Sequence, residues 1–415
     1  MTTEGDARAE RRLTALLTCA MAFSMLQLFL LGALGPRLVD ELGISATMLG
    51  LTTTIGFGTA AVLSPSGGRV VDRIGPRRSL VLLLLVSSAA LALIGAAPGA
   101  GLLLGAVALG GLPQALANPA TNKAVLAAVP PERRGAVTGT KQSGVQLGAF
   151  AAGLPLAALA GGVGWRGAVW TAAGTALLTG LWAWRALPTD PPPQAPAQAQ
   201  AQAQAQAPAA SPSQAPGGRP SFVPRGPIAR LALYSLFLGC GIASVNTYLA
   251  LFGTRALGLG PTAAGALVAV LGVAGIAGRI GWSRAARPGR AEWLPGLLAA
   301  GAVGAALLLA AAQAVGPAAW LGAAAVGVFA VAGNAVSMVL VLQRAAPGRA
   351  GRDSALVAAG FFAGFAVGPP LFGLLAETGR YGTGWLLVAA EFAAASAVAL
   401  AWARKDRTRG TVKAS

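Results

Sequence analysis

The chain contains no histidine and only two cysteines, and just 11% of its 415 residues are charged. Cys19 and Cys240 lie in separate apolar segments, so the sequence predicts neither a zinc site nor a haem site of ordinary type. We therefore expect no metal and no cofactor. A soluble enzyme, a disordered chain and a disulfide-stabilised secreted domain each need a different composition. The scarcity of charge indicates a chain that does not present a water-soluble surface.

The few charged residues are mostly of one sign, while 55% of the residues are hydrophobic. The chain has 31 Lys and Arg against 13 Asp and Glu, which gives a formal net charge of +18. A basic chain can bind nucleic acid, or its basic residues can orient it in a membrane. The positions of these residues along the chain decide between the two interpretations.

Twelve segments are apolar over the roughly 20 residues that a membrane-spanning helix needs. They lack the alternation of a transmembrane barrel, so the sequence predicts an all-α membrane protein. The predicted spans are residues 14–35, 47–66, 79–97, 101–127, 137–159, 165–185, 228–252, 262–283, 293–313, 317–342, 354–376 and 382–403.

All but four of the 31 basic residues fall on one side of these spans. The four exceptions are Arg37, Arg166, Arg255 and Arg380. By the positive-inside rule, both termini are cytoplasmic, and we expect a multi-pass protein of the cell (plasma) membrane. The basic residues form no strip interleaved with aromatics, so we expect no nucleic-acid partner; the lipid bilayer is the expected one.

A segment rich in Pro, Ala and Gln divides the twelve spans into two pseudo-symmetric halves of six. Landmarks recur between the halves at an offset of 215 residues, among them Gly50 and Gly265, Gly153 and Gly368, and Trp170 and Trp385. The predicted organisation is a cytoplasmic N-terminus at 1–13, an N-terminal half at 14–185, a disordered linker at 186–227, a C-terminal half at 228–403 and a basic cytoplasmic tail at 404–415.

The loop after the second predicted span reads Gly68-Arg-Val-Val-Asp72-Arg73-Ile-Gly75-Pro-Arg77-Arg78. It resembles the signature of the loop between spans two and three in the major facilitator superfamily. The resemblance implies a transporter whose two halves rock about a central site. It also implies a conformational latch in this loop, formed by Gly68, Asp72, Arg73, Gly75, Arg77 and Arg78. Arg133, Arg134 and the helix start near Ser354 are the expected partners of Asp72; alternatively, the arginines only anchor the topology.

Polar residues inside the predicted spans are costly in a bilayer and are therefore candidates for function. The resemblance places the following in or near a central cavity: Gln27, Asn118, Asn122, Lys141, Gln142, Gln146, Asn246 and Asn334. The alternative for each amide is a hydrogen bond that holds two helices together. Lys141 either faces the cavity, where it would favour anions, or reaches the cytoplasmic surface. Glu391 is the one acid deep in a span and is a candidate for ion coupling, although it could instead pair with a neighbouring helix.

These observations predict a secondary active transporter that moves a small organic solute by alternating access. Gradient-driven export (efflux) is the favoured direction, and uptake or exchange of a small organic anion is the alternative. A proton or another ion would supply the coupling, since no Walker-type phosphate loop occurs. We expect a monomer that is not an enzyme. A membrane sensor and an intramembrane enzyme are disfavoured, because the chain has no folded soluble domain and no catalytic group in its spans.

Overall fold

The computed structural model describes residues 2–189, 227–285, 293–344 and 350–412, and every regular element in these ranges is a helix. The predicted linker, 186–227, lies almost entirely outside the described residues. The first group of helices comprises α1 (Thr2–Ala33), α2 (Gly35–Leu42), α3 (Ala46–Ile74), α4 (Pro76–Ala96), α5 (Ala100–Ala128), α6 (Pro131–Ala151), the π-helical η1 (Ala152–Leu156) and α7 (Ala157–Ala186). The second group comprises α9 (Pro227–Arg255), α10 (Pro261–Ala285), α11 (Leu294–Ala311), α12 (Ala318–Ala325), the π-helical η2 (Val326–Val331), α13 (Ala332–Arg344), α14 (Ala350–Glu377) and α15 (Tyr381–Val412).

Eleven helical stretches among the described residues are long and apolar enough to cross a membrane. One of them, Glu132–Ala186, has 55 residues and contains both the fifth and the sixth predicted spans. Gly164 interrupts the helix between these two spans, with φ 75° and ψ 164°. This φ lies in a region that glycine adopts without steric cost, so the chain can change direction there. The difference between eleven stretches and twelve predicted spans arises at this position.

Short connections hold consecutive helices antiparallel. At the start of α3, Ser45 Oγ accepts a hydrogen bond from the Met48 amide at 3.1 Å, which satisfies one of the free donors of the first turn. Gly75, with φ 88°, is the single residue between α3 and α4, and Pro76 begins α4. Glycine is required at that turn, and proline is preorganised for the first helical position.

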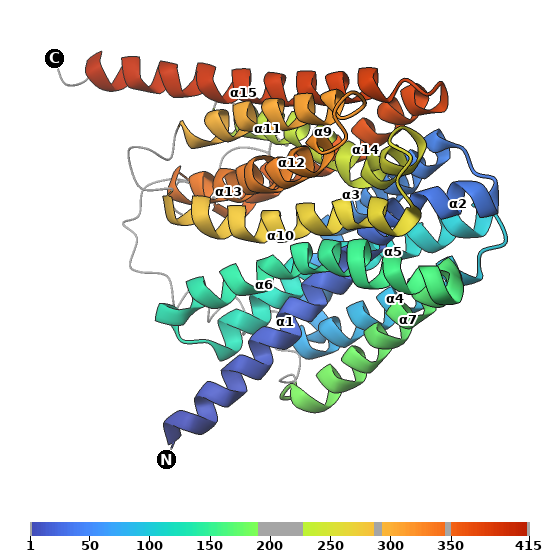
Figure 1. Ribbon diagram of the computed structural model, residues 1–415. Helices are drawn as coiled ribbons and strands as arrows, with labels where there is room; N and C mark the ends of the chain where they lie inside the picture. The colour runs from blue at the N-terminus through green and yellow to red at the C-terminus, as the bar shows by residue number, and fades with distance from the viewer. Residues whose placement is uncertain (1, 190–226, 286–292, 345–349, 413–415) are drawn as a thin grey trace.

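The helices pack into two bundles (Figure 1). Helices α1 to α7 contact one another, and α9 to α15 contact one another. Each bundle buries a large aromatic residue near its end: Trp165 is 1% exposed and Trp385 is 0% exposed. We call these bundles the N-terminal and C-terminal halves. α1 begins and α15 ends at the same end of the molecule, and α2 lies at the opposite end (Figure 1).

Several helix pairs join the halves, and two of them are equivalent under the 215-residue offset. In one pair, a Cβ atom on Gly50 of α3 would lie 2.8 Å from the Pro369 carbonyl oxygen of α14. In the other, a Cβ atom on Gly265 of α10 would lie 3.0 Å from the Gly153 carbonyl oxygen of η1. Glycine therefore permits the close approach at both places. The repeat seen in the sequence corresponds to a repeated interface.

The halves are in contact at the end that carries α2, which we call the α2 end. There, the ring centroids of Phe57 and Phe365 are 4.4 Å apart, and Thr54 donates to the Ala366 carbonyl. One turn further along the same face of α3, Ala61 is exposed, and the neighbouring Val62 is 77% exposed. The α3–α14 contact therefore stops after Phe57.

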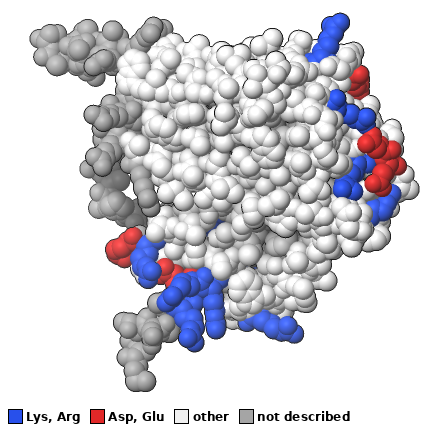
Figure 2. Space-filling view, in the orientation of Figure 1, with Lys and Arg blue, Asp and Glu red and all other residues white. Residues whose placement is uncertain are grey.

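The α6–α10 contact stops at a similar depth. Gly139 lies two turns before Gln146 on the face of α6 that packs on α10, and a Cβ atom there would meet no described atom within 4 Å. The halves thus diverge towards the opposite end of the molecule, which carries the loop around Asp72 and which we call the Asp72 end. Figure 2 shows that charged side chains gather at the two ends, with an uncharged band between them.

Candidate functional site

Four of the predicted polar residues meet between α5 and α6, at the depth where the halves diverge. Lys141 Nζ donates to Thr121 Oγ1 and to Asn122 Oδ1, each at 2.6 Å. One turn away, Gln142 Nε2 donates to Asn118 Oδ1 at 3.0 Å. Lys141 is completely buried, whereas Asn118 and Asn122 are exposed. We call Asn118, Asn122, Lys141 and Gln142 the amide–lysine cluster.

The hydrogen bonds of this cluster set the polarity of the surface that it presents. Both asparagine carbonyl oxygens accept from α6, so their NH2 groups remain as donors on the exposed side. Lys141 adds a positive charge directly behind them. The sequence of α5 has no acidic residue, and α6 has only Glu132, in its first turn. The cluster therefore offers donors and positive potential, which suits a ligand rich in acceptors.

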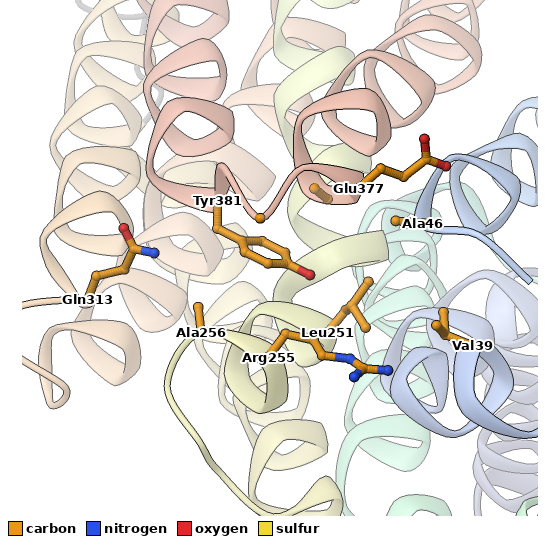
Figure 3. Close-up of a pocket in the computed structure, with 10 residues that line it drawn as sticks. Val39, Ala46, Leu251, Arg255, Ala256, Gln313, Glu377 and Tyr381 are labelled. Atoms are coloured by element: carbon orange, nitrogen blue, oxygen red, sulfur yellow. The ribbon is translucent and has the colours of Figure 1, made fainter.

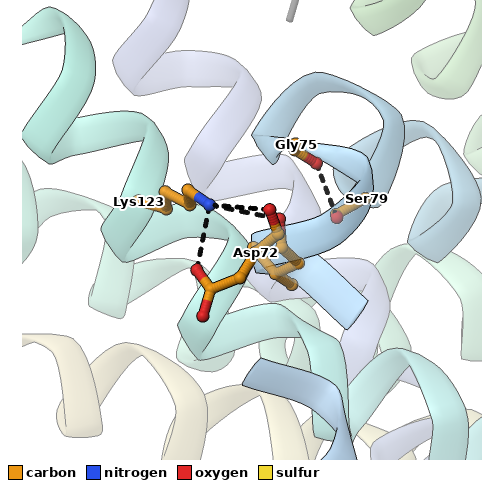
Figure 4. Close-up of polar contacts among 5 residues, drawn as sticks. Asp72, Gly75, Ser79 and Lys123 are labelled. Carbon is orange, nitrogen blue, oxygen red and sulfur yellow. Dashed lines mark hydrogen bonds and ion pairs between the residues drawn. The ribbon is translucent and has the colours of Figure 1, made fainter. Parts of the chain in front are cut away.

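The loop at the Asp72 end is held within the N-terminal half (Figure 4). Lys123 Nζ, on α5, lies 2.9 Å from Asp72 Oδ1 and 3.4 Å from the carbonyl oxygens of Val71 and Asp72. Ser79 Oγ donates to the Gly75 carbonyl across the turn. Arg77 stacks over the Trp184 ring at 4.5 Å. The loop is thereby fixed to α5 and α7, next to the amide–lysine cluster.

The expected partners of Asp72 have other contacts in this conformation. Arg133 pairs with Glu10 at 3.0 Å, and Arg134 Nε donates to the Val129 carbonyl at 2.9 Å. Arg73 and Arg78 are exposed, and a Cβ atom on Gly68 would meet no described atom within 4 Å. The side chain of Ser354 lies outside the described part of the chain. Here Asp72 is paired with Lys123, a partner that the sequence analysis did not consider.

A cavity of about 510 Å³ lies between the halves at the α2 end (Figure 3). The N-terminal half contributes Val39 and Ala46, and α9 contributes Arg255, which forms an ion pair with Asp40. Glu377 Oε1 accepts from the Thr47 amide at 3.1 Å, and thus ties the end of α14 to the start of α3. These polar contacts join the two halves beside the cavity.

The chain resembles known transporters in sequence profile and in fold. The family model described as Major Facilitator Superfamily matches residues 17–356. The chain belongs to this superfamily. No curated protein matches it in sequence.

Solved structures of other superfamily members have the same fold. One is a bacterial homologue of the human lysosomal transporter Spinster in an inward-facing, unoccupied conformation, with a TM-score of 0.72, 17% identity, and coverage of 95% of this chain and 97% of that one. The same homologue in its occupied conformation has a TM-score of 0.73 and 18% identity, with coverage of 96% of this chain and 97% of that one. A variant of the nucleoside transporter NupG has a TM-score of 0.73 and 12% identity, with coverage of 94% of this chain and 99% of that one. At these identities the likeness shows the fold alone. The chain is thus a multi-pass membrane transporter of a family that does not consist of enzymes.

The remaining cavity candidates are spread over this superfamily fold rather than gathered with the cluster. Gln27 is buried inside the N-terminal half and donates to the Val107 carbonyl at 3.4 Å. Gln146 is buried where α6 meets Gly275 of α10. Asn246 is buried in α9 near the α2 end, and Asn334 is half-buried in α13. Within the described residues, the side-chain oxygens Gln146 Oε1, Asn246 Oδ1 and Asn334 Oδ1 have no hydrogen-bond partner.

Glu391 lies on α15, 8% exposed, and its Oε2 has no hydrogen-bond partner among the described residues. It is close to Cys240 of α9, whose carbonyl oxygen would lie 2.4 Å from a Cβ atom on Gly368. The acid therefore sits in the core of the C-terminal half, away from the amide–lysine cluster of the N-terminal half.

Besides the Lys123 partner of Asp72, sequence reasoning missed two further features of this superfamily member. The pair of Asp40 and Arg255 was not singled out, although the two residues are 215 positions apart, the offset found for the repeat. Thr121, which binds Lys141, was also missed, because a threonine in an apolar helix has no distinctive pattern. In the first case the repeat was a usable signal. In the second, only the packing of α5 on α6 reveals the contact.

Proposed function

We propose that this chain is a secondary active transporter of a small organic solute, which it moves across the cell membrane by alternating access. The observation that carries the proposal is that the halves meet at the α2 end and diverge at the Asp72 end, beside a polar cluster. A site that opens to one side only is the requirement for alternating access. We count Glu132–Ala186 as two spans, which gives twelve with both termini in the cytoplasm. The proposed unit is a monomer.

The distribution of basic residues supports the orientation. Arg69, Arg73, Arg77 and Arg78 surround the loop at the Asp72 end, which the positive-inside rule assigns to the cytoplasm. The described conformation would then be inward-facing, as the two structures of the Spinster homologue are. In the outward-facing state, we expect the α2-end contacts to open and the Asp72 end to close.

Two substrate classes follow from the residues of the proposed site. Amides without a charge-specific arrangement favour a range of organic solutes, for which export is the proposed direction. The contacts of Lys141 favour the alternative, the uptake or exchange of a small organic anion, because a fully buried ammonium paired only with neutral oxygens leaves its charge uncompensated. We propose that the gradient acts through a proton or another ion, with Glu391 as the candidate carrier.

Counterflow in proteoliposomes tests the transport proposal. The purified protein is reconstituted into proteoliposomes, which are preloaded with one member of a panel of small carboxylates and their matched neutral amides. Trans-stimulated uptake of the same solute in labelled form is then measured. We expect counterflow for at least one solute. The absence of counterflow with every panel member would contradict transport.

The variant Lys141→Gln tests the anion alternative in the same assay. It should weaken carboxylate counterflow by about tenfold, which corresponds to 1.4 kcal/mol, and leave the neutral amides unchanged. Arg185→Gln, at an exposed arginine of the last turn of α7, is the control for a lost charge at the same end. An unchanged substrate profile in Lys141→Gln would exclude the anion alternative.

A further inference from the structure

We infer that Arg279 of α10 is the contribution of the C-terminal half to the substrate site, and that this site takes an organic anion between Arg279 and the amide–lysine cluster. The inference rests on the proposed function and names its substrate class. In the sequence, Arg279 is one of the basic residues that the positive-inside rule assigns to the cytoplasmic side. Its position on α10 gives it a different role.

Arg279 continues the stripe of α10 that packs on the N-terminal half. A Cβ atom on Gly265 would lie 2.7 Å from Ala157 Cβ, and one on Gly272 would lie 2.8 Å from the Phe150 amide nitrogen. A Cβ atom on Gly275 would lie 2.9 Å from Gln146 Oε1. Residues three, four and seven apart share a face of a helix, so Arg279 is the next position on this stripe.

The turn of α6 opposite Arg279 belongs to the cluster. α6 and α10 run antiparallel, so the contact of Gly275 with Gln146 places the following turn of α10 opposite residues 139–143 of α6. That turn holds Lys141 and Gln142, and Gly139 faces open space. Arg279 therefore stands where the two helices separate, across from the cluster.

Arg279 has no acidic partner among the described residues. Its Nε is buried without a hydrogen-bond partner in the described part of the chain, and none of the three ion pairs found there includes it. The sequences of α5, α10 and α13 contain no Asp or Glu. A buried guanidinium donor without an acceptor is costly, so a site of this kind is completed by an acceptor from outside.

The two sides together define the ligand. The N-terminal half offers asparagine NH2 donors backed by Lys141, and the C-terminal half offers a guanidinium, whose planar fork binds a carboxylate or phosphate through two hydrogen bonds. Helices α5 and α10 contain no acidic residue, and Asp72, next to the cluster, is already paired with Lys123. An anionic oxygen group bridging the halves would neutralise both cations, and it would draw α6 and α10 together at the Asp72 end, as closure of that end requires.

The local potential can be measured without knowing the substrate. Gly139→Cys, in a background of Cys19→Ala and Cys240→Ala, places a thiol in open space on the turn of α6 that we infer to lie opposite Arg279. The thiol is modified with an anionic reagent, sulfonatoethyl methanethiosulfonate, and with a cationic one, trimethylammonioethyl methanethiosulfonate. The rate with the anionic reagent divided by the rate with the cationic reagent reports the local potential. Thr189→Cys, exposed beyond the end of α7, gives the reference ratio for the same end of the molecule.

We expect the ratio of anionic to cationic rates to be about tenfold higher at position 139 than at position 189. Arg279→Gln should remove most of this preference, Arg279→Lys should retain it, and Arg185→Gln should leave it unchanged. Equal ratios at the two positions, or a preference that survives Arg279→Gln, would overturn the inference. Because no flux is measured, this result is independent of the counterflow experiment, whose failure would instead contradict the proposed transport.

Discussion

Asp40 and Arg255 form an ion pair across the α2 end, and they are also equivalent residues of the two repeats, 215 positions apart. Two equivalent residues that touch each other lie beside the pseudo-twofold axis that relates the halves. The equivalent positions of the two repeats therefore carry opposite charges, and the two side chains attract each other. The pair fastens α2 to the end of α9 in the conformation in which the halves meet there.

Asp40→Asn and Arg255→Gln should each favour opening of the α2 end. The side chains are 60% and 46% exposed, and an exposed pair contributes about 0.2–1 kcal/mol, which shifts the conformational equilibrium by about 1.4- to fivefold. Thr53→Cys reports opening, because Thr53 is 4% exposed at this interface and bonds to Thr247 at 3.0 Å. The measurement is its rate of thiol modification.

The doubly exchanged variant, Asp40→Arg with Arg255→Asp, is the control. Because the two positions are equivalent, the exchanged pair should restore the original modification rate. If it remains as open as the single variants, the pair does not act through attraction between these two residues.

Asp72→Asn should lower the transport rate while leaving membrane insertion intact. In this conformation Asp72 is bound to Lys123, and the latch hypothesis requires it to contact the C-terminal half when the Asp72 end closes. Lys123→Met is the matched variant, since it removes the contacts that Asp72 and Val71 make with Lys123 here but keeps the Asp72 carboxylate. Counterflow of Asp72→Asn should be slower than that of Lys123→Met. Equal rates in the two variants, or a normal rate in Asp72→Asn, would refute the latch.

Much of the fold follows from the sequence because a bilayer imposes simple constraints. Only helices satisfy their own backbone in lipid, so the apolar runs locate the helices closely: residues 293–313 were predicted and Leu294–Ala311 is observed. The break between spans five and six coincides with Gly164. The family was identified from the loop around Asp72, and the family model confirms it. Helix ends differ more, since α1 already begins at Thr2 and α15 continues to Val412.

The site was predictable only in part, because spacing along one helix does not say which other helix it faces. The spacing of Asn118 and Asn122 shows that they share a face of α5. Only the structure shows that this face is hydrogen-bonded to Lys141 and Gln142 of α6. Gln27 and Asn246 follow the same rule of a polar residue in an apolar span, yet they are buried elsewhere. The sequence does not distinguish Arg279 from the other basic residues, since its burial depends on where α10 meets α6.

Glu391→Gln should uncouple accumulation from a pH gradient while leaving exchange intact. The reason is that the neutral amide has nearly the size of the acid but cannot release a proton, and the described structure gives Oε2 no partner to lose. The measurement is uptake driven by an imposed pH gradient, compared with counterflow in the same vesicles. Ser396→Ala, which removes another buried polar group of α15, is the control. Gradient-driven accumulation that persists in Glu391→Gln would exclude this acid as the carrier.

The glycines of the repeated interface should be intolerant of substitution only where the halves meet. A Cβ atom on Gly153 would lie 2.3 Å from the Ala269 amide nitrogen of α10, whereas one on Gly139 meets no described atom within 4 Å. Gly153→Val should therefore push α10 away, at a cost of about 1–3 kcal/mol to the conformation closed at the α2 end. We expect a faster modification of Thr53→Cys in Gly153→Val, because the same contact holds that end shut. Gly139→Val adds the same side chain to the same helical segment, and it should leave the rate unchanged; if both variants accelerate modification equally, the effect comes from the valine itself and not from the interface.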